Sequence, residues 1–409
     1  MQRSRARADA DRRPGGRHPL VTRRSLERAA VCALVLYGLA ISIPRALAQT
    51  DERFVDRVSE QGQAARGLYL GASLVERHGH EAVVSAVRNA HMNAAVIDLK
   101  DAEGRVHYDT QIPELADMRT GWLGDARALT RALHEANMYA IGRIVCFADR
   151  SLPEHVPDRA IQSDRHRPRL WVSWGTGGTW LDPYNPENHR LVVELAREAE
   201  AMGFDEVQLD YVRFPVDDGV PFAHFPGQTD ETHAQVLLRL LRAVDEAIHI
   251  PIGVDVFGLA AYRDGDPSRL GQDLDAWSQY VEVYTPMLYT NSMRNWRVGE
   301  ENRAYALVYN GLHRLRERVG AAPVIRPFLQ AFAQGAGTEY NEDYIHQQIR
   351  AARRAGADGF LFWHPGQTYG MVRRAMRGPS RSLVPFPVPP ARSRARNGTA
   401  APPPRRRTR

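Results

Sequence analysis

Short apolar runs alternate with amphipathic segments between residues 66 and 378. Each apolar run is rich in β-branched residues and is followed by a loop and a stretch of helical periodicity, which predicts a strand followed by a helix. Continuous apolar strands that alternate with helices are typical of a parallel sheet. The expected strands are 67–72, 94–99, 139–147, 206–212, 251–257, 281–288, 324–329 and 359–363, and the expected helices are 80–91, 125–137, 186–202, 231–248, 271–280, 300–319, 340–355 and 368–377.

Eight such units in about 310 residues fit a single-domain α/β fold, the (β/α)8 TIM barrel. Gly203 and Gly356 stand where two of the helices should stop. A doubly wound open sheet is the competing fold. The absence of a Gly-x-Gly-x-x-Gly turn after the first strand weakens that alternative.

The segments on either side of the expected barrel (66–378) have a different composition. Residues 1–48 contain an arginine-rich start, an apolar run at 29–43 and the small-x-small sequence Ala46-Leu47-Ala48, which predict a cleaved signal peptide or an uncleaved signal anchor. Arg23-Arg24 suggests the twin-arginine export route. Residues 49–65 are expected to form a short linker, and the Pro- and Arg-rich residues 379–409 a disordered tail. We therefore expect an exported protein, periplasmic or extracellular, that contacts the membrane only if the signal stays uncleaved.

Charge and cysteine content remove several classes of function. The net charge of +6 comes from the two ends: residues 1–48 carry +7 and residues 379–409 carry +8, which leaves −9 for the middle. The expected barrel is thus acidic, and nucleic acid is not an expected partner. Two cysteines exclude a disulfide scaffold or a cysteine-rich zinc module, and Cys146, inside an apolar run, is expected to be a core residue.

Carboxylates stand where several of the expected strands end, and this is the end at which TIM-barrel enzymes place their chemistry. Asp210 and Asp255 end neighbouring strands, which lie about 4.8 Å apart. This spacing suits a retaining glycosidase, which needs two carboxyl groups ~5–5.5 Å apart. A pair that includes Asp98 would suit the wider separation of an inverting enzyme. Alternatively, the aspartates form structural ion pairs with Arg143, Arg213 and Arg326.

Other polar and aromatic side chains at these ends are expected to bind the substrate. Lys100, the only lysine in the chain, stands between Asp98 and Asp101 and is a candidate hydrogen-bond donor to sugar hydroxyls. Aromatic rings suit the apolar faces of sugars. The full expected set is Tyr69, Asp98, Lys100, Asp101, Arg143, Arg213, Tyr289, Arg326, Gln330, Trp363 and His364. Trp171, Trp174 and Trp180 line either a cleft or a packed loop, and Asn185-Pro186 reads as the start of a helix.

No cofactor and no metal site are expected. The histidines are scattered, with no His-x-x-x-His pair, and a serine nucleophile lacks the Gly-x-Ser-x-Gly elbow. A cation held by Asp98, Asp101 and Asp182 remains an alternative.

A series of motifs resembles the bacterial family of putative glycoside hydrolase domains that was long filed as a domain of unknown function. These motifs are GLYL (67–70), VIDLKD (96–101), WLDPY (180–184), GFDEVQLDYVRFP (203–215), DVFG (255–258), GQDL (271–274) and PMLY (286–289). The resemblance implies a TIM barrel that is distantly similar to the α-amylase-like glycosidases. It also implies that Asp210, on the fourth strand, is the nucleophile. On the fifth strand this chain has Asp255 where those glycosidases have glutamate.

We therefore expect an exported glycoside hydrolase that acts on an envelope or extracellular polysaccharide or oligosaccharide. Asp210 is the expected nucleophile and Asp255 the expected acid/base. Two other classes remain open: a non-catalytic carbohydrate-binding barrel, and a metal-dependent hydrolase or deacetylase.

Overall fold

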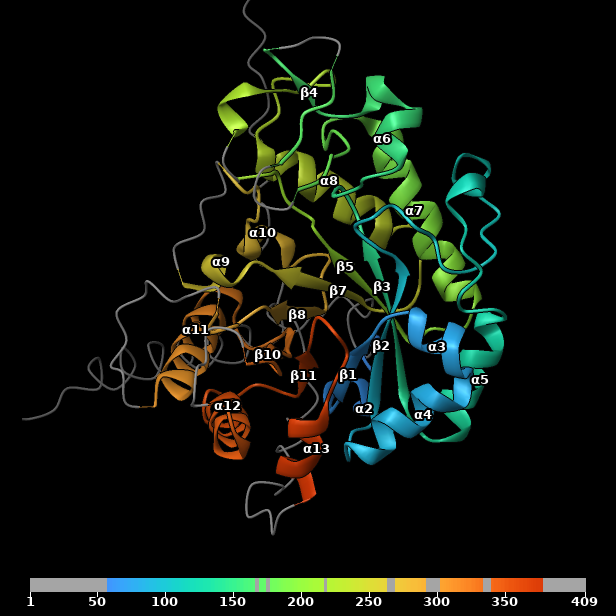
Figure 1. Cartoon of the computed structure of the whole chain (residues 1–409). Coiled ribbons are helices and arrows are strands. Elements are labelled where there is room, and N and C mark those ends of the chain that lie inside the picture. Colours follow the sequence, from blue (N-terminus) through green and yellow to red (C-terminus); the bar gives the residue numbers. More distant parts are fainter. Residues whose placement is uncertain are drawn as a thin grey trace, which may run out of the picture. The chain divides into compact units, whose positions relative to one another are not determined.

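The computed structural model of the chain (Figure 1) describes residues 57–165, 169–173, 177–216, 219–262, 269–291, 302–333 and 340–377. These residues all fall within one compact unit, from Phe54 to Arg394. The predicted signal segment, the predicted C-terminal tail and Trp174 lie outside the described residues. Among the described helices none is both long and apolar enough to cross a bilayer.

Parallel strands form a closed ring, as the alternation of apolar and amphipathic segments predicts. β1 pairs with β2 on one side and with β11 on the other, so the first and last strands meet. β9 and β10 are two segments of one strand, because Pro327 between them has no N–H to donate to the ladder. The ring therefore has eight strand positions: β1 (Arg66–Leu70), β2 (Ala94–Lys100), β3 (Tyr139–Val145), β5 (Glu206–Asp210), β7 (Ile252–Val256), β8 (Val283–Pro286), β9 (Val324–Ile325) with β10 (Phe328–Gln330), and β11 (Phe360–Trp363). This confirms the (β/α)8 barrel.

Helices surround the strands (Figure 1). Asn185 caps α7 by accepting a hydrogen bond from the backbone N–H of Glu187, and Pro186 takes the first helical position, as predicted. Thr232 and Gln235 form a capping box at the start of α8. The main helices are α3 (Ser73–His78), α4 (His80–Asn89), α5 (Ala126–Glu135), α7 (Pro186–Ala201), α8 (His233–Asp245), α9 (Gly258–Tyr262), α10 (Leu274–Trp277), α11 (Arg303–Val319), α12 (Glu342–Arg354) and α13 (Gly370–Arg377).

Side chains alternate between two apolar layers along each strand. In β2, Ala95 and Ile97 pack in the large layer between strands and helices, whereas Ala94 and Val96 belong to a smaller cluster. This cluster joins residues from β2, β3, β10 and β11, so it fills the barrel interior. Cys146 is buried in the large layer, which confirms it as a core residue. A side chain that faces inward at the end of a strand therefore stands above a packed apolar interior.

The segment before the first strand is part of the barrel, which corrects the expectation of a linker at 49–65 for the residues that the structure describes. The short helix α2 (Glu60–Gln63) brings the carbonyl of Gly62 to Arg326, inside the barrel. Arg57 pairs with Asp245 at 2.7 Å and also donates to the carbonyl of Ile248. These contacts tie residues 57–63 to the N-terminal end of the strands.

Candidate functional site

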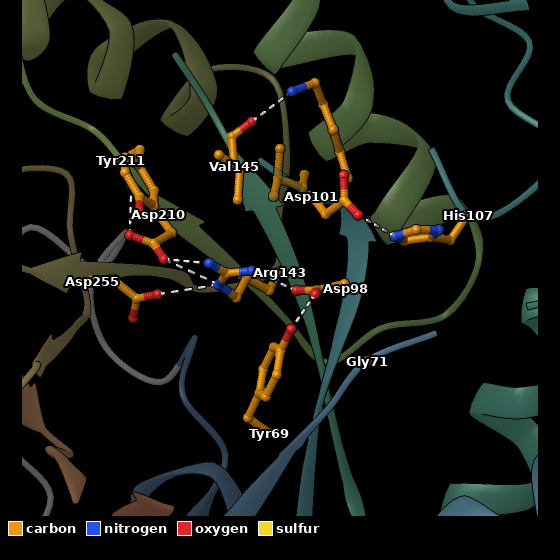
Figure 2. A network of polar contacts seen from close by, with 12 residues as sticks. Tyr69, Gly71, Asp98, Asp101, His107, Arg143, Val145, Asp210, Tyr211 and Asp255 are labelled. Carbon is orange, nitrogen blue, oxygen red and sulfur yellow. Dashed lines mark hydrogen bonds and ion pairs between the residues drawn. The ribbon is translucent and has the colours of Figure 1, made fainter. Parts of the chain in front are cut away.

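Three aspartates meet around one arginine at the C-terminal end of the strands. Asp98 (β2), Arg143 (β3), Asp210 (β5) and Asp255 (β7) come from four neighbouring strands and point toward one another (Figure 2). The guanidinium of Arg143 lies 2.5 Å from Asp98 Oδ1, 2.5 Å from Asp210 Oδ2 and 3.6 Å from Asp255 Oδ2. Although burial opposes the charge, Asp98 and Asp210 hold the pKa of Arg143 well above its usual value. The ion pairs that the sequence suggested for Arg143 are therefore present.

Asp210 is held from both sides by hydrogen-bond donors. Oδ2 accepts from Nε and Nη2 of Arg143, and Oδ1 accepts from the backbone N–H of Tyr211 at 2.6 Å. Tyr211 has φ of 54°, a left-handed conformation that is unfavourable for an aromatic residue. Such strain is characteristic of functional sites, and here it accompanies the hydrogen bond from the N–H of Tyr211 to the preceding carboxylate. These donors fix the orientation of the Asp210 carboxyl group.

Asp255 has a different environment. Its side chain is about 1% exposed, and neither carboxyl oxygen has a hydrogen-bond partner among the described residues. Burial and the negative charge of Asp210 raise the pKa of Asp255 well above its usual value, and Arg143 only partly opposes this. The two carboxyl groups on adjacent strands therefore differ in environment: Asp210 is held by hydrogen-bond donors, whereas burial and the charge of Asp210 favour the protonated form of Asp255.

Aromatic rings gather beside the carboxyl groups. The rings of Tyr289 and Trp363 are 5.3 Å apart, and Tyr69, which donates to Asp98 Oδ2 at 2.5 Å, lies 6.4 Å from Trp363. Phe332 completes the group at 5.4 Å from Trp363. Sequence reasoning missed Phe332, although the two-residue period of a strand that starts from Phe328 would have placed it on the inward side. These four rings form an aromatic cluster (Tyr69, Tyr289, Phe332, Trp363) of the kind that stacks on sugar faces; Phe332 is buried and the other three are partly exposed.

His364 lies at the edge of this aromatic cluster. Its ring centroid is 6.4 Å from that of Phe332, and its Nδ1 accepts a hydrogen bond from the backbone N–H of Gly366. Partial burial lowers the pKa of His364, so the ring is neutral at pH 7. The side chain is partly exposed, and its predicted place near the substrate stays a prediction.

Lys100 does not lie at the mouth of the barrel, which corrects its predicted role. Its side chain is fully buried, and Nζ lies 2.7 Å from Asp149 Oδ2 and donates to the carbonyl of Val145. Asp149 also accepts from the backbone N–H groups of Ser151 and Leu152. Lys100 thus anchors the loop after β3. The register of β2 on β3 shifts between Asp98 and Lys100, and this irregularity separates the two side chains.

Arg326 lies at the opposite end of the barrel interior, which also corrects the prediction. Its guanidinium contacts Glu206 at 2.5 Å, both side chains are 0% exposed, and Nη1 donates to the carbonyl of Gly62. Glu206 begins β5, whereas Asp210 ends it. Arg326 stands before the break at Pro327, too early in its strand to reach the carboxyl end.

Gln330 and Asp101 are occupied by structural hydrogen bonds, so neither fits its predicted role. The side chain of Gln330 accepts from Thr290 and Asn291 and donates to the carbonyl of Phe332. Asp101 binds Arg105 within the loop after β2 and also contacts His107, as Figure 2 shows. Although burial opposes it, these two partners lower the pKa of Asp101 to about 2.

Arg213 is surrounded by aromatic rings. The guanidinium carbon lies 4.9 Å from the ring centroid of Trp180, 5.2 Å from that of Tyr211 and 5.3 Å from that of Phe257. A planar guanidinium stacks well in this position. Its side chain is largely buried, against the rings of residues that follow Asp210 and Asp255 rather than at an open surface.

Trp171, Trp180 and Asp182 pack inside the protein. Trp180 is fully buried, and Trp171 donates to the carbonyl of Gly219. The oxygens of Asp182 accept from the backbone N–H groups of Tyr184 and Gly227, so this carboxylate connects two loops by hydrogen bonds. Within the described residues no group of three or more His, Cys, Asp or Glu side chains is arranged to hold a metal ion.

Comparison with solved structures agrees with the fold. The chain is 13% identical to the glycoside hydrolase domain of PgaB (BpsB) from Bordetella bronchiseptica, with a TM-score of 0.55 over 77% of this chain and 99% of that domain. It is 30% identical to a hypothetical protein from Ruminiclostridium thermocellum, over 46% of this chain and 97% of that one, with a TM-score of 0.41. No curated protein matches the chain.

A family model supplies the assignment that these structural similarities leave open. It matches residues 67–369, which include every strand from β2 to β11 and all of the residues around Arg143. The chain therefore belongs to the family described as "Putative glycosyl hydrolase domain".

Proposed function

We propose that this protein hydrolyses O-glycosidic bonds of a polysaccharide by a retaining mechanism, with Asp210 as nucleophile and Asp255 as acid/base. The observation that carries the proposal is the contrast between the two carboxyl groups. Asp210 is paired with Arg143, whereas Asp255 is buried without a hydrogen-bond partner among the described residues, and its pKa is raised. Environments that push two carboxyl pKa values apart provide one acid and one nucleophile at the same pH.

The proposed reaction has two steps. An oxygen of Asp210 attacks the anomeric carbon while the bond to the leaving oxygen breaks, and Asp255 gives its proton to that oxygen. In the second step the Asp255 carboxylate takes a proton from water, whose oxygen attacks the anomeric carbon and breaks the ester bond to Asp210. Arg143 orients Asp210, and the aromatic cluster stacks on the sugar.

We also propose that the protein is exported and that its substrate is an envelope or extracellular polysaccharide. The support lies in the sequence: arginines, an apolar run at 29–43 and a small-x-small site precede Gln49. Cleavage after Ala48 would leave a mature chain that starts at Gln49.

A reducing-end assay on bacterial and plant polysaccharides tests these proposals together. The full chain is expressed in a bacterial host, and the N-terminal residue of the exported protein is determined by mass spectrometry. We expect Gln49 at the N-terminus and new reducing ends with at least one polysaccharide, in the presence of a chelator. Binding without reducing ends would indicate a non-catalytic carbohydrate-binding barrel, and activity lost on chelation would indicate a metal-dependent hydrolase.

The raised pKa of Asp255 predicts the shape of the pH–rate profile. Because the acid must be protonated, kcat/KM is expected to fall as the pH rises through the raised pKa of Asp255, at a higher pH than for an ordinary carboxyl group. Asp255→Asn is expected to lower kcat/KM by about 10²–10⁴-fold and to remove this alkaline limb. If the alkaline limb persists unchanged in Asp255→Asn, a group other than Asp255 donates the proton to the leaving oxygen.

A further inference from the structure

The loop between α9 and α10 places a buried glutamine between the strands that carry the two carboxyl groups. Gly271 has φ of +78°, and a Cβ there would lie 2.9 Å from the carbonyl oxygen of His233, so this tight turn requires glycine. Asp273 caps α10 by accepting from the N–H of Ala276. Between these two fixed points, the side chain of Gln272 is buried, with about 1% of the residue exposed.

Gln272 connects the segments that follow β5 and β7, beyond the last backbone hydrogen bonds between these two strands. The last paired residues of β5 and β7 are Leu209 and Val254, one residue before each carboxyl group. Beyond that point Gln272 Nε2 donates to the carbonyl of Val212, and Oε1 accepts from the N–H of Phe257, both at 3.2 Å. Val212 and Phe257 each follow a carboxyl residue by two positions. One side chain therefore crosses the gap from the Asp210 strand to the Asp255 strand.

Arg213 makes a second contact between the same two segments. Its guanidinium lies against the ring of Tyr211, which directly follows Asp210, and against the ring of Phe257. A flat, charged group between two rings resists their separation, because both cation–π contacts weaken with distance.

We propose that Gln272 is a positioning residue that sets the separation of Asp210 and Asp255, with Arg213 as a second contact across the same gap. The proposal rests on the proposed glycosidase mechanism. Retaining chemistry needs the two carboxyl groups at ~5–5.5 Å, and a misplacement of about 1 Å costs about 10²-fold in rate. The two hydrogen bonds of Gln272, to the backbone after β5 and after β7, are suited to hold the distance between the two carboxyl groups.

Loss of the two hydrogen bonds of Gln272 is expected to change the pKa of Asp255, which a general loss of stability does not do. Without the two hydrogen bonds of Gln272, the ends of β5 and β7 are free to move apart. A larger separation weakens the repulsion that raises the pKa of Asp255. Asp255 then loses its proton at lower pH, so the alkaline limb of the pH–rate profile moves to lower pH.

The experiment compares Gln272→Leu with Gln348→Leu in the full chain. Gln348 is a matched control, because it is also a buried glutamine that binds two backbone groups, the N–H and carbonyl of Gln330. We expect Gln272→Leu to lower kcat by about 10²-fold with KM nearly unchanged and to move the alkaline limb to lower pH. Gln348→Leu should lose similar stability and keep the wild-type limb.

The two variants behaving alike, or an unmoved limb in Gln272→Leu, would overturn the proposal. If Gln272→Leu does not fold, Arg213→Lys keeps the charge but loses the planar stacking, and the limb is expected to move in the same direction. Full activity in Asp210→Asn would refute the mechanism itself. An inactive Asp210→Asn together with an unmoved limb in the Gln272 and Arg213 variants would refute only the positioning role.

Discussion

Replacing Asp210 by asparagine is expected to lower kcat by about three orders of magnitude or more while the barrel stays folded. Asparagine is isosteric with aspartate, and its side-chain oxygen can still accept from Arg143, while the hydrogen bond from the N–H of Tyr211 is lost. An uncharged amide is a poor nucleophile and gives no stable glycosyl ester. The measurement is kcat on whichever polysaccharide the wild type cleaves, with thermal unfolding followed in parallel.

Asp358→Asn is the matched control for this variant. Asp358 is also a buried aspartate paired with an arginine, Arg316, at 3.0 Å, but it lies two residues before β11, away from the carboxyl ends of the strands. We expect Asp358→Asn to lose stability and keep wild-type kcat, whereas Asp210→Asn loses kcat with a change in Tm of a few degrees. Full activity in Asp210→Asn would remove Asp210 from the chemistry and leave the barrel without an assigned nucleophile.

The barrel was predictable from sequence because its signals are local. All eight apolar runs became strand positions, since parallel strands covered on both faces must be continuously apolar. The break in the seventh strand also has a local cause, because Pro327 cannot donate to the ladder. Helix boundaries followed their capping residues, such as Asn185 and Thr232.

The site was predictable only in part, because its geometry depends on which way each side chain faces and how high it stands in the barrel. Asp98, Arg143, Asp210 and Asp255 follow the two-residue period of their strands, and they do meet. Lys100 stands two positions after Asp98, but the register shift between them breaks the period, and no sequence signal marks it. Gln272 lies outside every strand, and only the fold brings it between β5 and β7.

Arg326→Met is expected to have the largest effect on stability. The guanidinium contacts both oxygens of Glu206 in a fully buried pair, and among the described residues only Tyr139 also donates to that carboxylate. Removing one partner of a buried ion pair costs about 3–5 kcal/mol, because the remaining charge is uncompensated. Urea unfolding of the single variant, compared with wild type, measures this loss.

The pH dependence of that loss identifies its cause. Burial raises the pKa of Glu206 in the folded protein even with Arg326 present, and losing Arg326 raises it further. A carboxyl group whose folded pKa is raised contributes stability at low pH and loses it as the pH rises. The deficit of Arg326→Met is therefore expected to be larger at pH 8 than at pH 5.

A double variant separates an uncompensated charge from lost packing. Glu206→Gln combined with Arg326→Met leaves no buried charge, so it should recover most of the stability that the single variant loses. Activity per folded molecule should stay near wild type in both, because Arg326 pairs with the residue that begins β5 whereas Asp210 ends that strand. If Arg326→Met unfolds in urea as the wild type does but has a raised KM, the structural role of Arg326 would be contradicted. Arg326 would then be a substrate-binding residue, as its sequence position suggested.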